Sequence, residues 1–126
     1  MKHCPWDDAT LQSKVQALID KWLQILGLQN WNVVLEIVGE LDGAMQLSRV
    51  PSYRKVLLSV RNQNEHELEF SEAVMERNVV HELVHLLVDP IRSLMAHEFE
   101  RDGLIWMRYH NAEETTVDEL TSLILR

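Results

Sequence analysis

The fold of this chain depends most on one stretch, SEAVMERNVVHELVHLLV, which occupies residues 71–88. Its apolar residues recur at helical spacing, Ser71 is a suitable N-cap, and the Asp89-Pro90 pair that follows is a stop signal. Around a helix axis these apolar residues cover most of the circumference and leave one narrow polar strip: Asn78, His81, Glu82 and His85. A helix with so wide an apolar surface is mostly buried, so we expect it at the centre of the fold.

The segments before this helix predict another helix and a strand. In residues 7–26 the apolar residues again recur at helical spacing, and Gly27 follows as a C-terminal stop. Residues 31–38 are instead rich in β-branched and aromatic side chains and are followed by Gly39. We expect an amphipathic helix and then a strand.

Two further short strands are expected at residues 44–50 and 54–60. Asp42-Gly43 predicts a turn before the first of them, and Pro51-Ser52 interrupts the run before the second. The three strands together predict a small, mainly antiparallel sheet.

Beyond residue 90 the pattern remains helical. A helical segment with an interruption near Gly103 leads to Asn111, and a last helix is expected from about Ala112 to the end of the chain. The order is an N-terminal helix, a small sheet, the central helix and C-terminal helices, which is typical of an α+β domain.

Size and charge limit the classes of protein to which the chain can belong. At 126 residues, of which 46% are hydrophobic, it can bury one core and has no room for a second, so we expect a single domain over residues 1–126. The 12 basic and 20 acidic residues give a formal net charge of −8. Because negative charge is repelled by a phosphate backbone and by an anionic membrane surface, we expect neither nucleic acid nor membrane as a partner.

Cysteine content and apolar runs bear on the location of the protein. Cys4 is the only cysteine, so no disulfide can form within the chain, and a reducing compartment fits best. No stretch approaches the roughly 18 uninterrupted apolar residues of a membrane span, and the first residues lack the apolar core of a signal peptide. We therefore expect a soluble, cytoplasmic protein.

The polar strip of the central helix contains His81-Glu82-Leu83-Val84-His85, an HExxH pattern. Residues four apart lie on one helical face, so both imidazoles can bind one metal ion. Glu82 is turned about 100° around the axis, where its carboxylate can act on a metal-bound water as a general base. The alternative is a pair of core histidines that are satisfied by backbone carbonyls and by Glu82. We favour metal binding, because three polar groups on a buried helix would otherwise lose hydration with little return.

A catalytic zinc site needs a third protein ligand and an open position for water. We favour Glu114, because it begins the expected last helix and has Asp118 one turn later on the same face. One helix would then supply both a ligand and a carboxylate that orients a ligand histidine. The other candidates for the third ligand are Glu113, His97 and His110.

Glu114 also has an explanation that needs no metal. Asn111 and Glu114 have the spacing of a capping box, and acidic residues in a first helical turn favour the helix dipole. The two interpretations are compatible, since a carboxylate at the start of a helix can also bind a metal ion.

The HExxH stretch followed by Glu114-Thr115-Thr116-Val117-Asp118 resembles the gluzincin pattern of zinc metallopeptidases, in which a glutamate on a downstream helix is followed four residues later by an aspartate. The size of the chain, the small sheet and the ending at residues 114–121 are similar to the ImmA/IrrE-type metallopeptidase domains of bacteria and phages. SprT-like domains are also similar but complete the site with a histidine, a role that His97 or His110 would take here.

Together with the motif, the resemblance implies zinc-dependent hydrolysis of peptide bonds in a protein or peptide substrate. One zinc ion per chain would be held by His81, His85 and Glu114, and Glu82 would be the general base for the zinc-activated water. Three side chains that can donate a hydrogen bond are candidates for stabilising the transition state: Tyr53, Tyr109 and His110.

Two other functional hypotheses remain open. One is a zinc-binding regulatory or interaction module without turnover, and the other is a structural protein without metal. Glu82 favours the enzyme, since neither metal binding nor folding requires a carboxylate at that position.

The small size of the chain also bears on how a substrate would bind. Little of the chain is left for deep pockets, so we expect an extended substrate segment along an exposed edge of the sheet, at residues 44–50 or 54–60. Pro51 between these segments suits an edge strand. The alternative is that a loop covers the edge.

Overall fold

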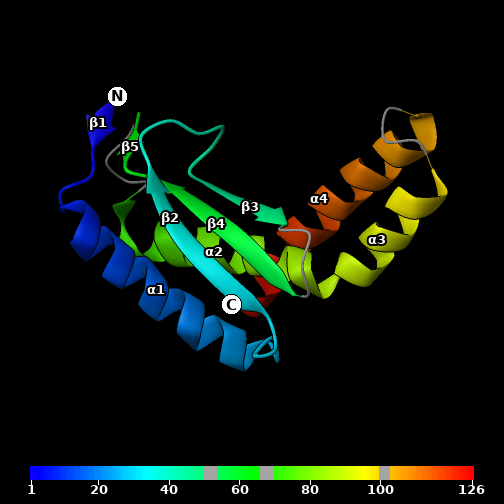
Figure 1. Cartoon of the computed structure of the whole chain (residues 1–126), viewed down its shortest axis with the longest axis horizontal. Helices are drawn as coiled ribbons and strands as arrows, with labels where there is room; N and C mark the ends of the chain where they lie inside the picture. The colour runs from blue at the N-terminus through cyan, green and yellow to red at the C-terminus, as the bar shows by residue number, and fades with distance from the viewer. Residues whose placement is uncertain (50–53, 66–69, 100–102) are drawn as a thin grey trace. The chain divides into compact units, whose positions relative to one another are not determined.

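The structure is a computed structural model of the chain (Figure 1). It describes residues 1–49, 54–65, 70–99 and 103–126. By internal packing the chain falls into two compact units, Met1–Glu82 and Leu83–Arg126. The first unit contains the strands, and the second is helical. That residues 1–126 fold as one domain stays a prediction.

The first unit begins with helix α1, Asp8–Ile25, which confirms the helix predicted at residues 7–26. The Asp7 side chain caps it by accepting a hydrogen bond from the backbone N–H of Thr10 at 2.7 Å. After the helix, Gly27 has a φ of 70°, a left-handed conformation that glycine adopts without strain. The buried residues of α1 recur every three or four positions and form its inner face: Leu11, Val15, Ile19 and Trp22.

Helix α1 packs beside a three-stranded sheet whose order is β2-β4-β3 (Figure 1). Strand β2 is Asn32–Val38, β3 is Met45–Arg49, and β4 is Lys55–Arg61. β2 pairs with β4 in parallel, while β3 pairs with β4 antiparallel, so the sheet is mixed. Because β4 is the central strand, the prediction that residues 54–60 could offer a free edge is wrong.

The burial of the strands agrees with this order. β4 has buried residues on both of its faces, which is expected for a central strand that is covered on each side. The turn expected at Asp42-Gly43 is present, and Gly43 has a φ of 87°. A second, small ladder joins β1, Lys2–His3, to β5, Gln63–Asn64. Pro51 and Ser52 lie outside the described residues.

Helix α2, Glu72–Leu87, is the predicted central helix and runs from the first unit into the second. The hydroxyl of Ser71 accepts a hydrogen bond from the backbone N–H of Val74 at 3.3 Å, as expected of an N-cap. Most of its apolar circumference is buried as predicted, although Leu87 at its end is exposed; the buried residues are Met75, Val79, Val80, Leu83, Val84 and Leu86.

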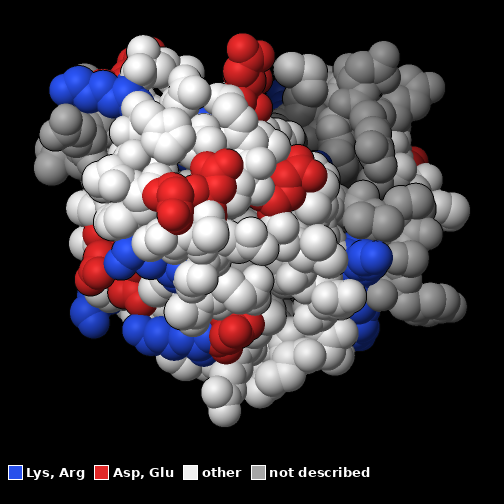
Figure 2. Space-filling view, turned by 60° about the vertical axis from the view of Figure 1, so that its left-hand side comes forward, with Lys and Arg blue, Asp and Glu red and all other residues white. Residues whose placement is uncertain are grey.

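Polar contacts also join α1 to α2 within the first unit. Lys21 and Trp22 both donate hydrogen bonds to the Glu76 carboxylate, at 2.9 and 3.0 Å. Charged groups of both signs also lie on the surface. Figure 2, in which the side that carries α1 comes forward, shows acidic and basic side chains interspersed among uncharged ones.

The second unit contains helices α3, Asp89–Glu98, and α4, Leu104–Ile124, which pack against each other. Pro90 lies in the first turn of α3, where its missing N–H costs nothing. Gly103 is the N-cap of α4.

The expectation that the last helix begins near Ala112 is wrong, because α4 continues through this position from Leu104. Asn111 is exposed in the interior of the helix, and its carbonyl accepts a hydrogen bond from the Thr115 hydroxyl at 3.1 Å. Tertiary burial explains the continuity, since one stripe of buried residues runs past Asn111 on both sides: Trp106, Glu113, Val117 and Thr121.

The α+β class is confirmed, with helices before and after small sheets of antiparallel and mixed pairing. Among the described residues, no helix combines the length and the apolar character needed to cross a membrane.

Candidate metal centre

Helix α2 carries three of the four predicted site residues. His81 and His85 are one turn apart on this continuous helix and therefore lie on the same side of it, with Glu82 next to His81. All three side chains are partly exposed, whereas Val80, Leu83, Val84 and Leu86 beside them are buried. The polar strip is therefore partly exposed to solvent, although buried residues flank it.

The second unit brings His85 together with Glu114, the fourth predicted residue. His85 Nε2 and Glu114 Oε1 are 3.2 Å apart, and the two side chains are 13% and 43% exposed. Two donors bound about 2.0–2.2 Å from one tetrahedral zinc ion would be about 3.4 Å apart. An imidazole nitrogen and a carboxylate oxygen are also donors that zinc prefers. The pair therefore fits a zinc ion in chemistry and in spacing, although 3.2 Å is equally a hydrogen-bond distance.

The position of Glu114 within α4 removes one explanation of this residue. Because α4 begins at Leu104, Glu114 is in the third turn of the helix and not in the first. The capping box expected from Asn111 and Glu114 is therefore wrong, and so is a favourable interaction of Glu114 with the N-terminal end of the helix dipole. In the structure, the Glu114 carboxylate instead contacts the imidazole of His85.

The neighbouring carboxylate, Glu113, is in a different environment. Its Oε2 lies 2.6 Å from Arg92 Nη1 and 3.4 Å from His85 Nδ1, and its Oε1 accepts a hydrogen bond from the Tyr109 hydroxyl at 3.1 Å. Its side chain is only 1% exposed. Both oxygens of Glu113 already have a partner and the side chain is buried, so Glu113 is a poorer third ligand than Glu114.

The remaining candidates for the third ligand are less favourable than Glu114. His110, Glu113 and Glu114 can bring one donor atom each within 4.8 Å of one another, but His110 is exposed and Glu113 is already bound by Arg92. His97 is exposed in the last turn of α3. Among the described residues, it belongs to neither group of three side chains that could hold an ion.

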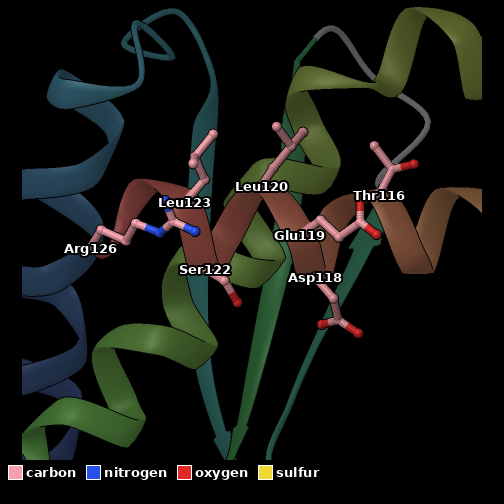
Figure 3. A pocket seen from close by; sticks show the side chains of 7 residues that line it. All are labelled: Thr116, Asp118, Glu119, Leu120, Ser122, Leu123 and Arg126. Atoms are coloured by element: carbon pink, nitrogen blue, oxygen red, sulfur yellow. The ribbon is translucent and has the colours of Figure 1, made fainter.

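Two further expectations from the sequence concern the candidates for stabilising the transition state and the role of Asp118. Tyr109, a candidate for stabilising the transition state, donates its hydroxyl to Glu113, and Tyr53 lies outside the described residues. A carboxylate of α4 that the sequence did not single out for this role, that of Glu113, lies beside Nδ1 of His85, while the orientation of a ligand histidine by Asp118 stays a prediction. Asp118 is exposed on α4 and lines an open hollow along this helix, where Figure 3 shows it extending in a direction away from Leu120.

Of the Glu113 contacts with Tyr109 and Arg92, only the one with Tyr109 could be expected from the sequence. Tyr109 and Glu113 are four residues apart, a spacing that places them on one face of a helix. Arg92 has no such relation to Glu113 in sequence. It is held in the structure by the packing of α3 against α4 and lies over the ring of Trp106, 5.1 Å from the ring centroid.

The sequence resemblance to gluzincins rests on the short stretches around His81 and Glu114. Models of protein families, curated proteins and solved structures were compared with the chain, and none of them matches it. A functional assignment therefore depends on the chemistry of the side chains described above.

Proposed function

We propose that this protein is a zinc-dependent peptidase in which His81, His85 and Glu114 hold one zinc ion. The observation that carries the proposal is the 3.2 Å separation of His85 Nε2 and Glu114 Oε1. These residues come from two different helices, and the sequence pattern alone predicts each of them as a ligand. Chance placement of a histidine beside a glutamate explains the contact alone but does not explain its agreement with the HExxH pattern.

His81 joins this pair through the geometry of α2. The helix runs without interruption from Glu72 to Leu87, so a residue four positions before His85 lies on the same side and one turn along. Its partial exposure leaves the imidazole accessible. Two imidazoles and one carboxylate are a donor set found at catalytic zinc sites, which keep the fourth position open.

Glu82 is suited to move the protons of hydrolysis. When bound, zinc supplies a Lewis acid, which polarises a carbonyl group and lowers the pKa of a water molecule toward neutrality. The Glu82 carboxylate accepts a proton from the attacking water as the new C–O bond forms. It then delivers this proton to the amine nitrogen as the C–N bond breaks, so the carboxylate is restored at the end of the cycle.

The substrate proposed is an extended segment of a protein, added as a strand to the outer edge of β3. Among the described strands, β3 has β4 on one side and no strand on the other. The backbone N–H of Arg61 donates to the carbonyl of Ala44, which lies opposite it in the register. Hydrogen bonding alternates along an antiparallel strand, so Met45 and Leu47 direct their N–H groups outward. These groups would bind the substrate backbone without a deep side-chain pocket.

A Glu82→Gln variant tests the enzyme against the zinc-binding module without turnover. The amide preserves the volume of the side chain and loses the basic oxygen, so zinc content should be retained while hydrolysis of an unfolded protein such as casein falls about 10²- to 10⁴-fold. Glu98→Gln, an exposed change on α3, should alter neither quantity. Zinc-loaded wild-type protein that cleaves no member of a broad panel of unfolded proteins would favour the module.

A further inference from the structure

His85 has a carboxylate near each of its two ring nitrogens. Nε2 lies 3.2 Å from Glu114, and Nδ1 lies 3.4 Å from Glu113. The two glutamates are consecutive residues of α4, so their side chains leave the helix about 100° apart. This difference in direction lets one helix approach both sides of the same imidazole.

Glu113 is fixed in place more firmly than a carboxylate that merely neutralises a charge. Arg92 and Tyr109 each approach a different oxygen of Glu113, at 2.6 and 3.1 Å. Trp106, which is buried, lies under the Arg92 guanidinium and is in ring contact with Tyr109, with centroids 5.7 Å apart. A buried carboxylate with partners at both oxygens has one orientation available, and its distance from Nδ1 follows from that orientation.

We infer that Glu113 is a positioning residue, which holds the His85 ring with Nδ1 protonated and with Nε2 directed toward the metal ion. The inference rests on the proposed function, since it assigns the second nitrogen of a proposed ligand. A neutral imidazole carries one proton. An ion bound at Nε2, the nitrogen that faces Glu114, would leave that proton on Nδ1, where the Glu113 carboxylate would accept it. Carboxylates in this position fix the ring and raise the basicity of a ligand histidine.

Arg92 and Tyr109 act one step further away. They hold Glu113 by its oxygens, so changes at these residues alter the orientation of His85 without touching the ligands themselves. A purely structural ion pair between Arg92 and Glu113 would stabilise the contact of α3 with α4 but would leave the Nδ1–H group of His85 in the zinc-loaded protein unaffected. The exchange of that N–H group with water is therefore the quantity that separates the two roles.

The test compares wild-type protein with Glu113→Gln in two measurements. Competition with a chromophoric chelator gives the zinc dissociation constant, and ¹H–¹⁵N NMR of the zinc-loaded protein gives the rate at which His85 Nδ1–H exchanges with water. In the variant, zinc affinity should fall about 10- to 100-fold, and Nδ1–H should exchange faster, because an amide oxygen is a weaker acceptor than a carboxylate. Glu119→Gln, an exposed change on α4, is the matched control and should alter neither result.

A second variant keeps the inference testable if Glu113→Gln does not fold. Tyr109→Phe removes only the hydroxyl that donates to Glu113, and a several-fold loss of zinc affinity is expected in a protein whose circular dichroism is unchanged. An unchanged dissociation constant and an unchanged exchange of His85 Nδ1–H in a folded variant of Glu113 or Tyr109 would overturn the inference. If wild-type protein binds no zinc, the proposed function and the inference both fail, whereas zinc binding that depends on Glu114 but not on Glu113 overturns the inference alone.

Discussion

Replacement of Glu114 by glutamine should remove most of the stabilisation of the protein by zinc while leaving the zinc-free fold intact. Zinc at about 100 times its dissociation constant adds about 2.7 kcal/mol to the free energy of unfolding when it binds only the folded state. For 126 residues, an unfolding entropy of about 2.1 cal/mol/K per residue converts this into a rise in melting temperature of about 10 °C. Wild-type protein should show a shift of this size.

The variant should differ from wild type only when zinc is present. The Glu114 side chain is 43% exposed, and a substitution at such a position changes zinc-free stability by about 0.5 kcal/mol or less, which is about 2 °C. If losing this ligand weakens binding about 100-fold, the same zinc concentration adds only about 0.4 kcal/mol. The expected shift in melting temperature therefore falls to about 2 °C.

The assay is a thermal melt followed by circular dichroism, with and without zinc, together with elemental analysis of the dialysed protein. His97→Ala, His110→Ala and Glu119→Gln are matched controls at exposed positions and should keep the full zinc shift. A Glu114→Gln protein that retains one zinc and the full shift would refute the ligand assignment. If His97→Ala or His110→Ala then loses the shift, the SprT-like arrangement is the correct one.

Two further predictions concern the substrate edge and acid stability. Leu47→Pro removes an outward N–H of β3 and should reduce substrate cleavage without lowering zinc content. Leu47→Ala, which keeps this N–H, should have a smaller effect, and equal cleavage by both variants would exclude binding along this edge. The hydrogen bonds from Lys21 and Trp22 hold the pKa of the Glu76 carboxyl below its ordinary value of 4.5. Because the pKa is lower in the folded state, this stabilisation is present above about pH 4.5 and is lost as the pH falls through the folded value. The difference in unfolding free energy between wild type and Glu76→Gln, measured in urea, should therefore shrink below about pH 4.5, and a difference that stays constant down to pH 3 would contradict it.

The helices α1 and α2 were predictable from short-range sequence patterns. The cap at Ser71 and the apolar spacing of α1 and α2 are short-range features, and both helices form close to the expected bounds. Two strands of the main sheet, β2 and β4, also form where β-branched residues are frequent, whereas β3 contains none. The order of these strands was not predictable in the same way, because it depends on pairing between segments that are distant in sequence. Spacing alone does not distinguish a parallel β2–β4 pair from a hairpin.

Tertiary burial explains why the predicted start of the last helix was wrong. Asn111 has a weak helical preference and is followed at a suitable distance by Glu114, so it was interpreted as the start of a helix. In the structure, burial of Trp106 and Val117 on either side of Asn111 favours one continuous helix. A single exposed residue of low propensity costs less than the loss of that packing.

The candidate site was predictable as a set of ligands but not as a network. HExxH and the downstream glutamate identify His85 and Glu114 as neighbours because metal chemistry demands a particular donor set at a particular spacing. Glu113 and Glu114 are the same type of residue, so residue type does not distinguish their roles. Only the fold shows that one of them is covered by Arg92 and Tyr109 while the other remains accessible.

This division of roles between two adjacent glutamates has an electrostatic consequence for the proposed chemistry. The guanidinium of Arg92 offsets the charge of Glu113, so the carboxylate that remains available to a cation beside His85 is that of Glu114. Neutral imidazoles from His81 and His85 with one carboxylate would leave a bound divalent ion with a net charge of about +1, whereas two bound carboxylates would cancel its charge. A residual positive charge is what polarises a carbonyl group and favours the ionised form of water. Arg92 would thus let the protein place a second carboxylate against His85, where it would orient the ring, without reducing the electrophilic character that the proposed hydrolysis requires.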